Sequence, residues 1–384
     1  MKSIRDLKFK EKMNINTLLY LGIIILCALL FIYLDLNKGG DILVPFFNIS
    51  LSIGYLISII QKCLVFAVVA LSMNMVTGFT GLFSLGQAGF MALGAYTTAI
   101  FTIPVKSRAG VYYMNGILPA LEKMSLPIPI AIILGGLVAA TFAALIGIPV
   151  LKLKSDYLAI ATLGFSEIIR AVIAAPMMNQ ITNGSLGLNK IPTFNKDFPS
   201  LECYIYCLIP IVLMILILNS STGRDFKAIR EDEIAARAVG INIFKTKELS
   251  FVVSSFFTGV GGGLLAMYLR TMKSGIFSIT LTYEILLIVV LGGIGSITGS
   301  IIGSFVVNGG QELLRFFDEP CEIAGVNIPL FKPGFRMVIF SILLMVVVLF
   351  FRKGLLGGRE LSINKFKRRK RGKVLNDDSE GGNI

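Results

Sequence analysis

Long apolar runs, broken by glycine, proline or charged residues, follow one another along most of the chain. Most of them reach the roughly 20 residues that cross a hydrocarbon core of about 30 Å at a helical rise of about 1.5 Å per residue. The pattern therefore predicts an all-α, polytopic membrane bundle of about ten transmembrane helices. The predicted spans are residues 17–34, 54–76, 84–103, 128–150, 156–175, 203–219, 249–269, 281–294, 297–314 and 335–351.

Three of the apolar segments need separate interpretation. The run 281–294 is short for a full crossing, so a tilted, half-buried or re-entrant helix is expected there. The segment 43–53 contains Pro45 and Asn48, and we expect it to lead into the next span along the membrane surface. The run 17–34 follows a basic segment, as in a signal peptide, but no small-residue cleavage site follows it, which favours a retained first helix.

Composition supports one membrane domain rather than two soluble ones. Hydrophobic residues make up 55% of the chain and charged residues only 15%, whereas soluble domains carry about a quarter charged residues. The predicted organisation is a basic N-terminus at 1–16, a transmembrane domain at 17–351 and a basic tail at 352–384, which we expect to touch anionic lipid. The net charge of +13 does not indicate nucleic acid, because the basic residues lie beside apolar runs.

The distribution of Lys and Arg predicts the orientation. Segments on one side of the predicted membrane hold 23 of these residues, and the loops on the other side hold nine. Because positive charge concentrates on the cytoplasmic side, both termini and the loop 220–248 are expected to be cytoplasmic. An even number of crossings, such as ten, satisfies this N-in, C-in topology.

Glycine-rich segments interrupt the apolar pattern in three places, at 78–96, 259–263 and 292–303. Small residues let helices pack closely, and breaks also expose backbone groups that membranes tolerate only beside protein or a water-filled cavity. Free N–H groups near a helix start favour a carboxylate, such as that of an amino acid. Candidate residues of a translocation path are Asn74, Gly81, Ser84, Gln87, Thr162, Gly292 and Gly293.

Ionisable residues inside the predicted spans are few. Two acid–base pairs with a spacing of three residues are expected to neutralise each other: Glu167 with Arg170, and Glu312 with Arg315. The sequence offers no obvious partner for Lys62 or Glu284. The chain has no His, so no His-dependent nucleophile and no HExxH zinc site is possible, and its Cys residues lack metal-ligand spacing. An intramembrane enzyme is therefore disfavoured, and no metal or cofactor is expected.

The loop 220–248 is the most informative polar segment. Its residues favour one helix from about Arg224 to Val239, with Gly240 placed to end it. Ala235, Ala236 and Ala238 form a low-relief patch flanked by charge, which suits docking into a groove on a partner. A solvated connector is the alternative, although a plain connector needs far fewer residues.

Residues 233–240 (EIAARAVG) resemble the EAA loop of ABC importer permeases, the cytoplasmic element that contacts the ATPase subunits. The wider segment 230–242 is similar to the form found in branched-chain amino acid permeases of the LivM type. The resemblance runs from about residue 55 to 357. Gln87 stands where the family often has His, and the loop 104–127 is longer than usual. Further similar segments are 73–88 (MNMVTGFTGLFSLGQA), 155–164 (SDYLAIATLG), 183–188 (NGSLGL) and 290–296 (VLGGIGS).

The resemblance implies a heteromeric importer in a prokaryotic inner or plasma membrane that works by alternating access. It implies two ABC ATPase subunits, a homologous second permease and an extracytoplasmic solute-binding protein as partners. No Walker A pattern is present in the sequence, so ATP hydrolysis is expected in the partners. The ATPase-coupling residues carried over by the resemblance are Arg230, Glu233, Ala235, Ala236 and Gly240.

Branched-chain amino acids are the expected substrates, and urea, simple sugars or nucleosides are the alternatives among ABC permeases. A stand-alone secondary transporter or channel also suits the glycine-broken helices. Such a protein would need no docking helix on its inner face, which favours the importer.

Overall fold

A computed structural model describes the chain at residue 22 and over residues 24–44, 49–114, 116–153, 155–195, 197–314, 322–323, 326–327, 338–342, 345 and 354–355. The predicted basic N-terminus, Arg315, most of the predicted span 335–351 and almost all of the basic tail lie outside these residues.

Two long helices form the centre of the bundle: α2 (Ile53–Asn74), which continues through the π-helical turn η1 (Met75–Phe79), and α12 (Ile243–Leu269). Helices α3 (Gln87–Thr102) and α6 (Ile128–Val150) pack against α12. A Cβ at Gly94 would overlap the backbone of Gly259, so the small residues allow these helices to approach closely. The predicted close packing through glycine is confirmed here.

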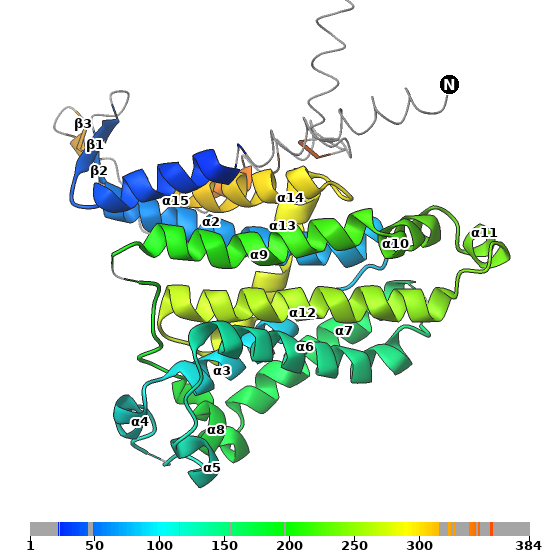
Figure 1. The fold of residues 1–384 in the computed structure, drawn as a ribbon, viewed down its shortest axis with the longest axis horizontal. Helices are drawn as coiled ribbons and strands as arrows, with labels where there is room; N and C mark the ends of the chain where they lie inside the picture. Colours follow the sequence, from blue (N-terminus) through cyan, green and yellow to red (C-terminus); the bar gives the residue numbers. More distant parts are fainter. Residues whose placement is uncertain are drawn as a thin grey trace, which may run out of the picture.

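The remaining helices surround this centre (Figure 1). Helix α7 (Ser155–Ala174) contacts α3 and α6, α9 (Pro199–Asn219) contacts α2, and α13 (Ile279–Gly292) leads to α14 (Ile297–Ser304), η5 (Phe305–Gly309) and α15 (Gly310–Leu313). A further helix spans Ile24–Leu36. Short helical segments complete the connections: α4 (Val105–Val111), α5 (Pro119–Glu122), η2 (Pro176–Met178), α8 (Asn179–Thr182), η3 (Gly184–Leu186), α10 (Ser221–Glu231), α11 (Glu233–Ala238) and η4 (Ser274–Phe277).

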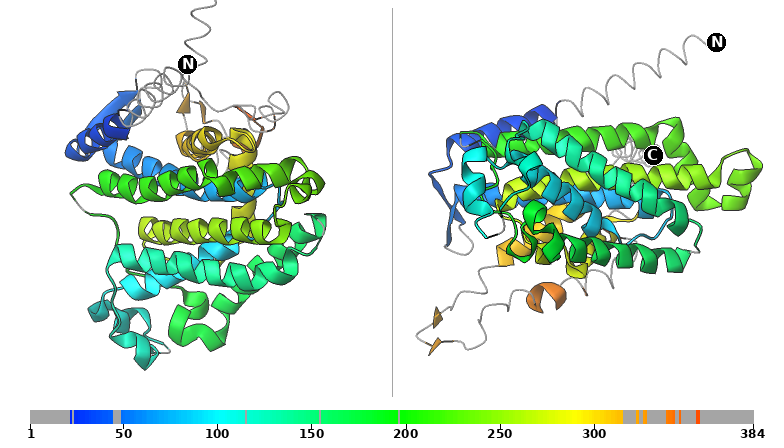
Figure 2. Two further views of the ribbon diagram at one scale, coloured as in Figure 1. Left: turned by 45° about the vertical axis from the view of Figure 1, so that its right-hand side comes forward. Right: turned by 90° about the horizontal axis from the view of Figure 1, so that it is seen from below.

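The predicted spans coincide with helices wherever the structure describes them. Five helices among the described residues are long and apolar enough to cross a membrane, or six if α3 and α4, which are bent by 119°, form one span. The total of ten and the orientation remain predictions. The short run 281–294 corresponds to the 14-residue helix α13, which lies across the direction of α2 and α12 (Figures 1 and 2).

The segment 43–53, which is expected to lead into the next span along the membrane surface, contributes to a β-hairpin. Strands β1 (Asp41–Val44) and β2 (Ile49–Ser52) pair antiparallel, with Asp41 opposite Ser52. The strands contain β-branched and other apolar residues, which favour an extended backbone. The apolar character of the segment alone did not predict that it forms strands. A second short antiparallel pair joins β3 (Glu322–Ile323) and β4 (Val326–Asn327).

The β1–β2 hairpin and the α10–α11 segment lie at opposite ends of the long axis (Figures 1 and 2). We call these the hairpin end and the loop end. At the hairpin end, Asp35 accepts the backbone N–H groups of Ser200 (3.2 Å) and Leu201 (3.1 Å). This carboxylate satisfies donors in the first turn of α9 and favours its positive end, so it fixes the Ile24–Leu36 helix to α9.

A buried arginine organises the predicted outer loop 104–127. Arg108, only 2% exposed, donates to the backbone oxygens of Ile103 (3.1 Å), Ile100 (3.2 Å) and Met124 (2.6 Å). Tyr112 lies beside it, and burial raises the pKa of this tyrosine to about 12, although Arg108 acts in the opposite direction. The guanidinium thus gathers several carbonyl groups that would otherwise lack donors.

Candidate functional site

The loop-end segment consists of two helices rather than the single helix predicted for 224–239. Helix α10 ends at Glu231, and the next residue, Asp232, has an extended backbone (φ −159°). The Oδ1 of Asp232 accepts the N–H groups of Ile234 (2.7 Å) and Ala235 (3.1 Å). Asp232 is therefore an N-cap that starts a new helix. Gly240 has φ +89° and follows the end of α11, which confirms the predicted stop.

Helix α11 exposes apolar side chains at its ends. Ile234 is 83% exposed and Val239 is 77% exposed, and Ala235 and Ala238 are exposed as well. We call Ile234, Ala235, Ala238 and Val239 the coupling patch. Isolated exposed apolar side chains are common, but a group of them on a short charged helix is typical of a contact surface.

Of the predicted patch of Ala235, Ala236 and Ala238, only Ala236 is not part of this exposed surface. Its side chain is 4% exposed and packs against Ile229 of α10 and Ile243 at the start of α12. Glu233 is also tied to the bundle, because its Oε1 lies 2.5 Å from Nζ of Lys247. These contacts hold α11 against the first turns of α12.

Arg230, an ATPase contact according to the resemblance, is an exposed residue whose guanidinium reaches the bundle. Its Nη1 donates to the backbone oxygen of Gly78 at 2.5 Å. Its side chain also lies over Gly81 and Gly295, which have φ +78° and +80°. The same face of α10 carries Phe226, which is fully buried and anchors the helix. Arg230 thus contacts two glycine turns from different parts of the chain.

Asn74 joins these two turns from inside the bundle. Its Oδ1 accepts the N–H of Gly295 (2.8 Å), and its Nδ2 donates to the backbone oxygen of Ser296 (2.9 Å) and to Oγ of Ser300 (2.7 Å). Asn74 is fully buried, so these bonds form in a low-dielectric environment where an unmade bond is costly. A Cβ at Gly78 would overlap the Asn74 side chain and lie 2.5 Å from the nitrogen of Gly295.

We call this assembly of Gly78, Gly81, Gly293, Gly295 and Asn74 the glycine junction. Gly293, between α13 and α14, has φ +119°, a conformation that only glycine adopts readily. The neighbouring Gly292 packs directly against the backbone of Gly299. The structure therefore brings Asn74, Gly81, Gly292 and Gly293 together from the predicted path residues.

The other predicted path residues form a separate, closely packed polar group. Gln87 begins α3, as the predicted helix start requires, and its Oε1 accepts a hydrogen bond from Thr258 at 2.5 Å. Thr258 also lies 2.8 Å from Oγ of Ser72. Thr162 of α7 accepts the N–H of Leu85 at 3.0 Å, and Ser84 is fully buried.

These side chains fix α3 to α2, α7 and α12. Gln87 and Thr162 are each 1% exposed, and neither they nor Ser84 line either of the two cavities described below. Nε2 of Gln87 has no hydrogen-bond partner among the residues that the structure describes.

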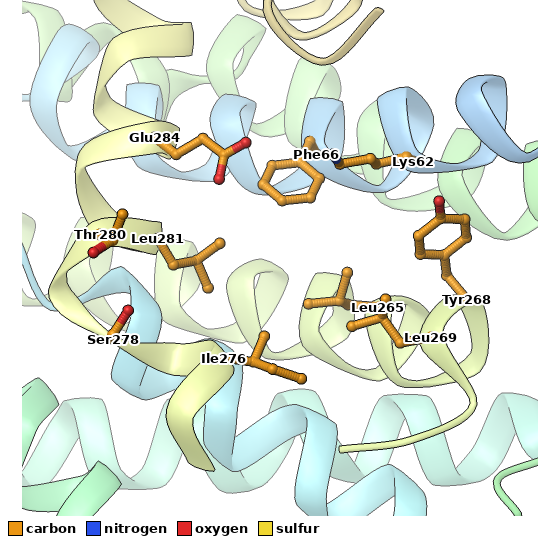
Figure 3. Close-up of a pocket in the computed structure, with 10 residues that line it drawn as sticks. All are labelled: Lys62, Phe66, Leu265, Tyr268, Leu269, Ile276, Ser278, Thr280, Leu281 and Glu284. Atoms are coloured by element: carbon orange, nitrogen blue, oxygen red, sulfur yellow. The ribbon is translucent and has the colours of Figure 1, made fainter. Parts of the chain in front are cut away.

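Two of the cavities on the described part of the bundle have charged side chains in their walls. One, of about 440 Å³, lies at the loop end. The other, of about 270 Å³, lies between α2, α12, η4 and α13 (Figure 3). The first is lined by Gly81, Leu82, Leu151, Lys152, Leu153, Leu158, Glu233, Arg237, Ile243, Phe244 and Lys247. The second is lined by Lys62, Phe66, Leu265, Tyr268, Leu269, Ile276, Ser278, Thr280, Leu281 and Glu284.

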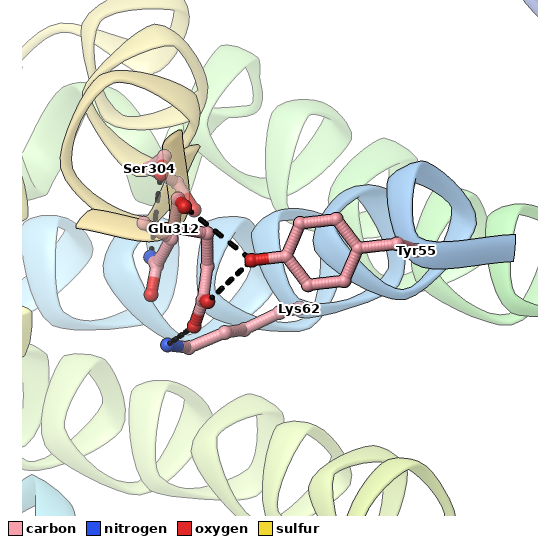
Figure 4. A network of polar contacts seen from close by, with 5 residues as sticks. Tyr55, Lys62, Ser304 and Glu312 are labelled. Carbon is pink, nitrogen blue, oxygen red and sulfur yellow. Dashed lines mark hydrogen bonds and ion pairs between the residues drawn. The ribbon is translucent and has the colours of Figure 1, made fainter. Parts of the chain in front are cut away.

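Lys62 has a partner that the sequence did not reveal. Its Nζ lies 3.2 Å from Oε1 of Glu312, whose Oε2 accepts a hydrogen bond from the Tyr55 hydroxyl at 3.2 Å (Figure 4). Glu312 was expected to pair with Arg315, which lies outside the described residues. The predicted pair of Glu167 and Arg170 is confirmed, with Oε2 and Nη2 2.6 Å apart.

Comparison with known proteins places this chain in a family. The model of the branched-chain amino acid transport system permease component matches residues 55–349, which contain the glycine junction and the α10–α11 segment. The chain belongs to this family. The structure contains several helices that are long and apolar enough to span a membrane, as expected for a member of a multi-pass membrane permease family.

Individual relatives include permeases with different named substrates. The high-affinity branched-chain amino acid permease proteins LivM of Salmonella typhimurium and Escherichia coli are 32% and 33% identical to this chain over 294 residues. These alignments cover 68% of this chain and 64% of each LivM protein. A nucleoside ABC transporter permease, NupC of Lactococcus lactis, is 23% identical over 52% of this chain and 62% of its own length. No solved structure matches the chain.

Proposed function

We propose that the chain is a transmembrane permease subunit of an ATP-driven ABC importer that translocates branched-chain amino acids by alternating access. The observation that carries this proposal is the α10–α11 segment, because it exposes the coupling patch outward while Arg230 contacts the glycine junction inward. A self-sufficient transporter has no need for such an element. Nucleosides are the alternative substrate class, since NupC is similar to this chain.

The proposed setting is a prokaryotic inner or plasma membrane, with the loop end in the cytoplasm. The excess of Lys and Arg in the segments assigned to that side supports the orientation. The proposed transmembrane domain is 17–351, flanked by a basic cytoplasmic N-terminus at 1–16 and a basic tail at 352–384. Ten crossings satisfy this topology, including the parts of the chain that the structure does not describe.

The proposed partners are two ABC ATPase subunits, a homologous second permease, an extracytoplasmic solute-binding protein and membrane lipid. The coupling patch and the adjoining 440 Å³ cavity are the surface proposed for the ATPase subunits. Ala235 and Gly240 remain candidate contacts because both are exposed. We assign Ala236 and Glu233 to holding α11 in place, since one is buried and the other is paired with Lys247.

Arg230 is the proposed mechanical link to the membrane helices. When ATP binding moves the partner subunits, α10 and α11 would move as a unit because Ile229, Ala236 and Ile243 pack together. The bond from Arg230 to the oxygen of Gly78 would carry this displacement to η1 and to the α13–α14 turn. Glycine turns absorb backbone rotation at low steric cost, so the junction is suited to serve as a hinge.

A charge placed on the coupling patch tests the proposal. In the complete importer reconstituted with ATPases, second permease and binding protein, I234E should lower ATP-dependent leucine uptake by about tenfold or more and reduce ATPase co-purification. The reason is that the substituted carboxylate would be desolvated in the contact without a partner. Leucine uptake and adenosine uptake are measured side by side to separate the two substrate classes.

The matched control is M114E, which places the same charge on a side chain that is 65% exposed in the loop 104–127. This variant should retain both ATPase binding and uptake. Equal retention of both by I234E would contradict the docking role, and leucine uptake that needs no ATPase subunit would contradict the importer assignment.

A further inference from the structure

The 270 Å³ cavity has charged and apolar walls (Figure 3). Lys62 reaches it from α2 and Glu284 from α13, with Phe66 between them in the view. Facing them are aliphatic side chains of α12, η4 and α13, namely Leu265, Leu269, Ile276 and Leu281. The volume lies just below the range of roughly 300–1,000 Å³ of drug-sized pockets, so the space suits a molecule of amino-acid size.

The charged groups around this cavity are unequal in number. Two carboxyl groups, Glu284 and Glu312, accompany one amine, Lys62. Lys62 pairs with Glu312 at 3.2 Å, whereas Glu284 makes no ion pair within 4.0 Å and no hydrogen bond among the residues that the structure describes. Ionisable groups at membrane depth are expensive and mark sites for ions or substrates. Glu284 is therefore suited to a ligand cation.

Lys62 retains capacity for a ligand anion. An ammonium group has three donors, and Glu312 Oε1 occupies one of them. The hydroxyl groups of Ser278 and Thr280 also line the cavity. Lys62 and Glu284 lie on the same side of the cavity in Figure 3. An anionic and a cationic group of one ligand could therefore both be held on that side.

We propose that this cavity binds an α-amino acid zwitterion with an aliphatic side chain, through Glu284 on the ammonium group and Lys62 on the carboxylate. The aliphatic wall of Leu265, Ile276 and Leu281 would take the substrate side chain. Burial of the substrate's CH₂ groups against this wall favours binding, so leucine would bind more tightly than glycine. This proposal names a substrate site in the permease and rests on the proposed importer function.

The test uses the complete importer in proteoliposomes, with ATP inside and ¹⁴C-leucine outside. E284Q should lower kcat/KM for leucine on the order of 30-fold, as expected for removing one partner of a buried charge pair. ATP hydrolysis and assembly of the complex should stay near the wild-type level. E167Q is the matched control, because Glu167 is paired with Arg170 away from the cavity, and it should keep full uptake.

A second pair of variants tests the aliphatic wall by volume. L281W should fill the cavity, because Leu281 lines it, and should lower leucine uptake more than glycine uptake. Y283W changes an adjacent side chain on α13 that is 52% exposed and should leave both unchanged. A loss of leucine uptake by L281W without that selectivity would contradict the assigned wall.

The outcomes separate the two proposals. If the wild-type importer takes up leucine with ATP and E284Q does so equally well, the site is wrong and the proposed function stands. If the wild-type importer takes up adenosine but not leucine, the proposed substrate class and the amino acid site are both wrong. If E284Q lowers leucine uptake while E167Q does not, the site is supported.

Discussion

The two ends of the α2 helix make different kinds of contact with the rest of the bundle. At the loop end, the glycine junction joins α2, η1 and the α13–α14 turn through backbone groups, Asn74 and the guanidinium of Arg230. Toward the hairpin end, Tyr55 and Lys62 on the same helix meet Glu312 and the cavity through ionisable side chains. Backbone contacts depend on position and not on side-chain identity, whereas charged side chains select partners. This difference suits a moving hinge at one end and recognition at the other.

The largest expected effect comes from adding one methyl group to the hinge. G78A would place a Cβ in overlap with Asn74 and 2.5 Å from the nitrogen of Gly295. Overpacking typically costs about 1–3 kcal/mol, and the displaced Asn74 would lose buried hydrogen bonds as well. We expect a lower melting temperature in detergent and almost no uptake.

G164A provides the comparison for this variant, because a Cβ at Gly164 of α7 meets no atom within 4 Å. This variant should fold as well as the wild type or slightly better, since Ala favours helix by about 1 kcal/mol over Gly. Equal melting temperatures for the two variants would mean that the junction tolerates substitution and is not a closely packed hinge.

A smaller effect on folding, but a clear one on coupling, is expected for R230A. Loss of the bond to the Gly78 oxygen should cost about 1 kcal/mol of stability, because Arg230 is an exposed residue, while α10 remains anchored by Phe226 and Ile229. Leucine uptake per ATP hydrolysed should fall about tenfold, because the loop would then move without displacing the junction.

The control for this variant is R224A, an exposed arginine on the same helix. Its ratio of uptake to ATP hydrolysis should stay unchanged. A fall of ATP hydrolysis and uptake in proportion in R230A would instead indicate that Arg230 contacts the ATPase, as the sequence resemblance implied.

The features that sequence reasoning predicted correctly depend on local pattern. Apolar runs located the helices, Gly240 marked the end of α11, and the spacing of Glu167 and Arg170 gave an ion pair. Asp232 is a local signal that the prediction of a single helix did not take into account, since Asp before a helical segment strongly favours an N-cap. Reading that signal would have divided the predicted 224–239 helix into α10 and α11.

The features that sequence reasoning missed depend on contacts between distant segments. Lys62 and Glu312 are 250 residues apart, so no spacing rule pairs them. The contact of Arg230 with Gly78 and the burial of Ala236 depend on where η1 and α12 lie, which helical periodicity alone does not give. The β1–β2 hairpin was missed because short apolar runs suit a strand and a membrane-surface segment equally well.

The smallest expected effect tests whether the ion pair of Lys62 and Glu312 is structural or part of recognition. E312Q removes one charge of a partly buried pair while keeping the shape and a hydrogen-bond acceptor for Tyr55. Its expected cost is about 1 kcal/mol, compared with about 0–1 kcal/mol for the more exposed Glu167–Arg170 pair in E167Q. Lys62 would then lack its ion-pair partner and should bind the substrate carboxylate more strongly, so we expect KM for leucine to fall about twofold. The stability of the fold should decrease slightly. Thermal unfolding in detergent and leucine uptake measure the two changes. An unchanged KM together with lower stability would mean that the pair only stabilises the fold. Recognition of the substrate at the cavity would then depend on Glu284 of α13 alone.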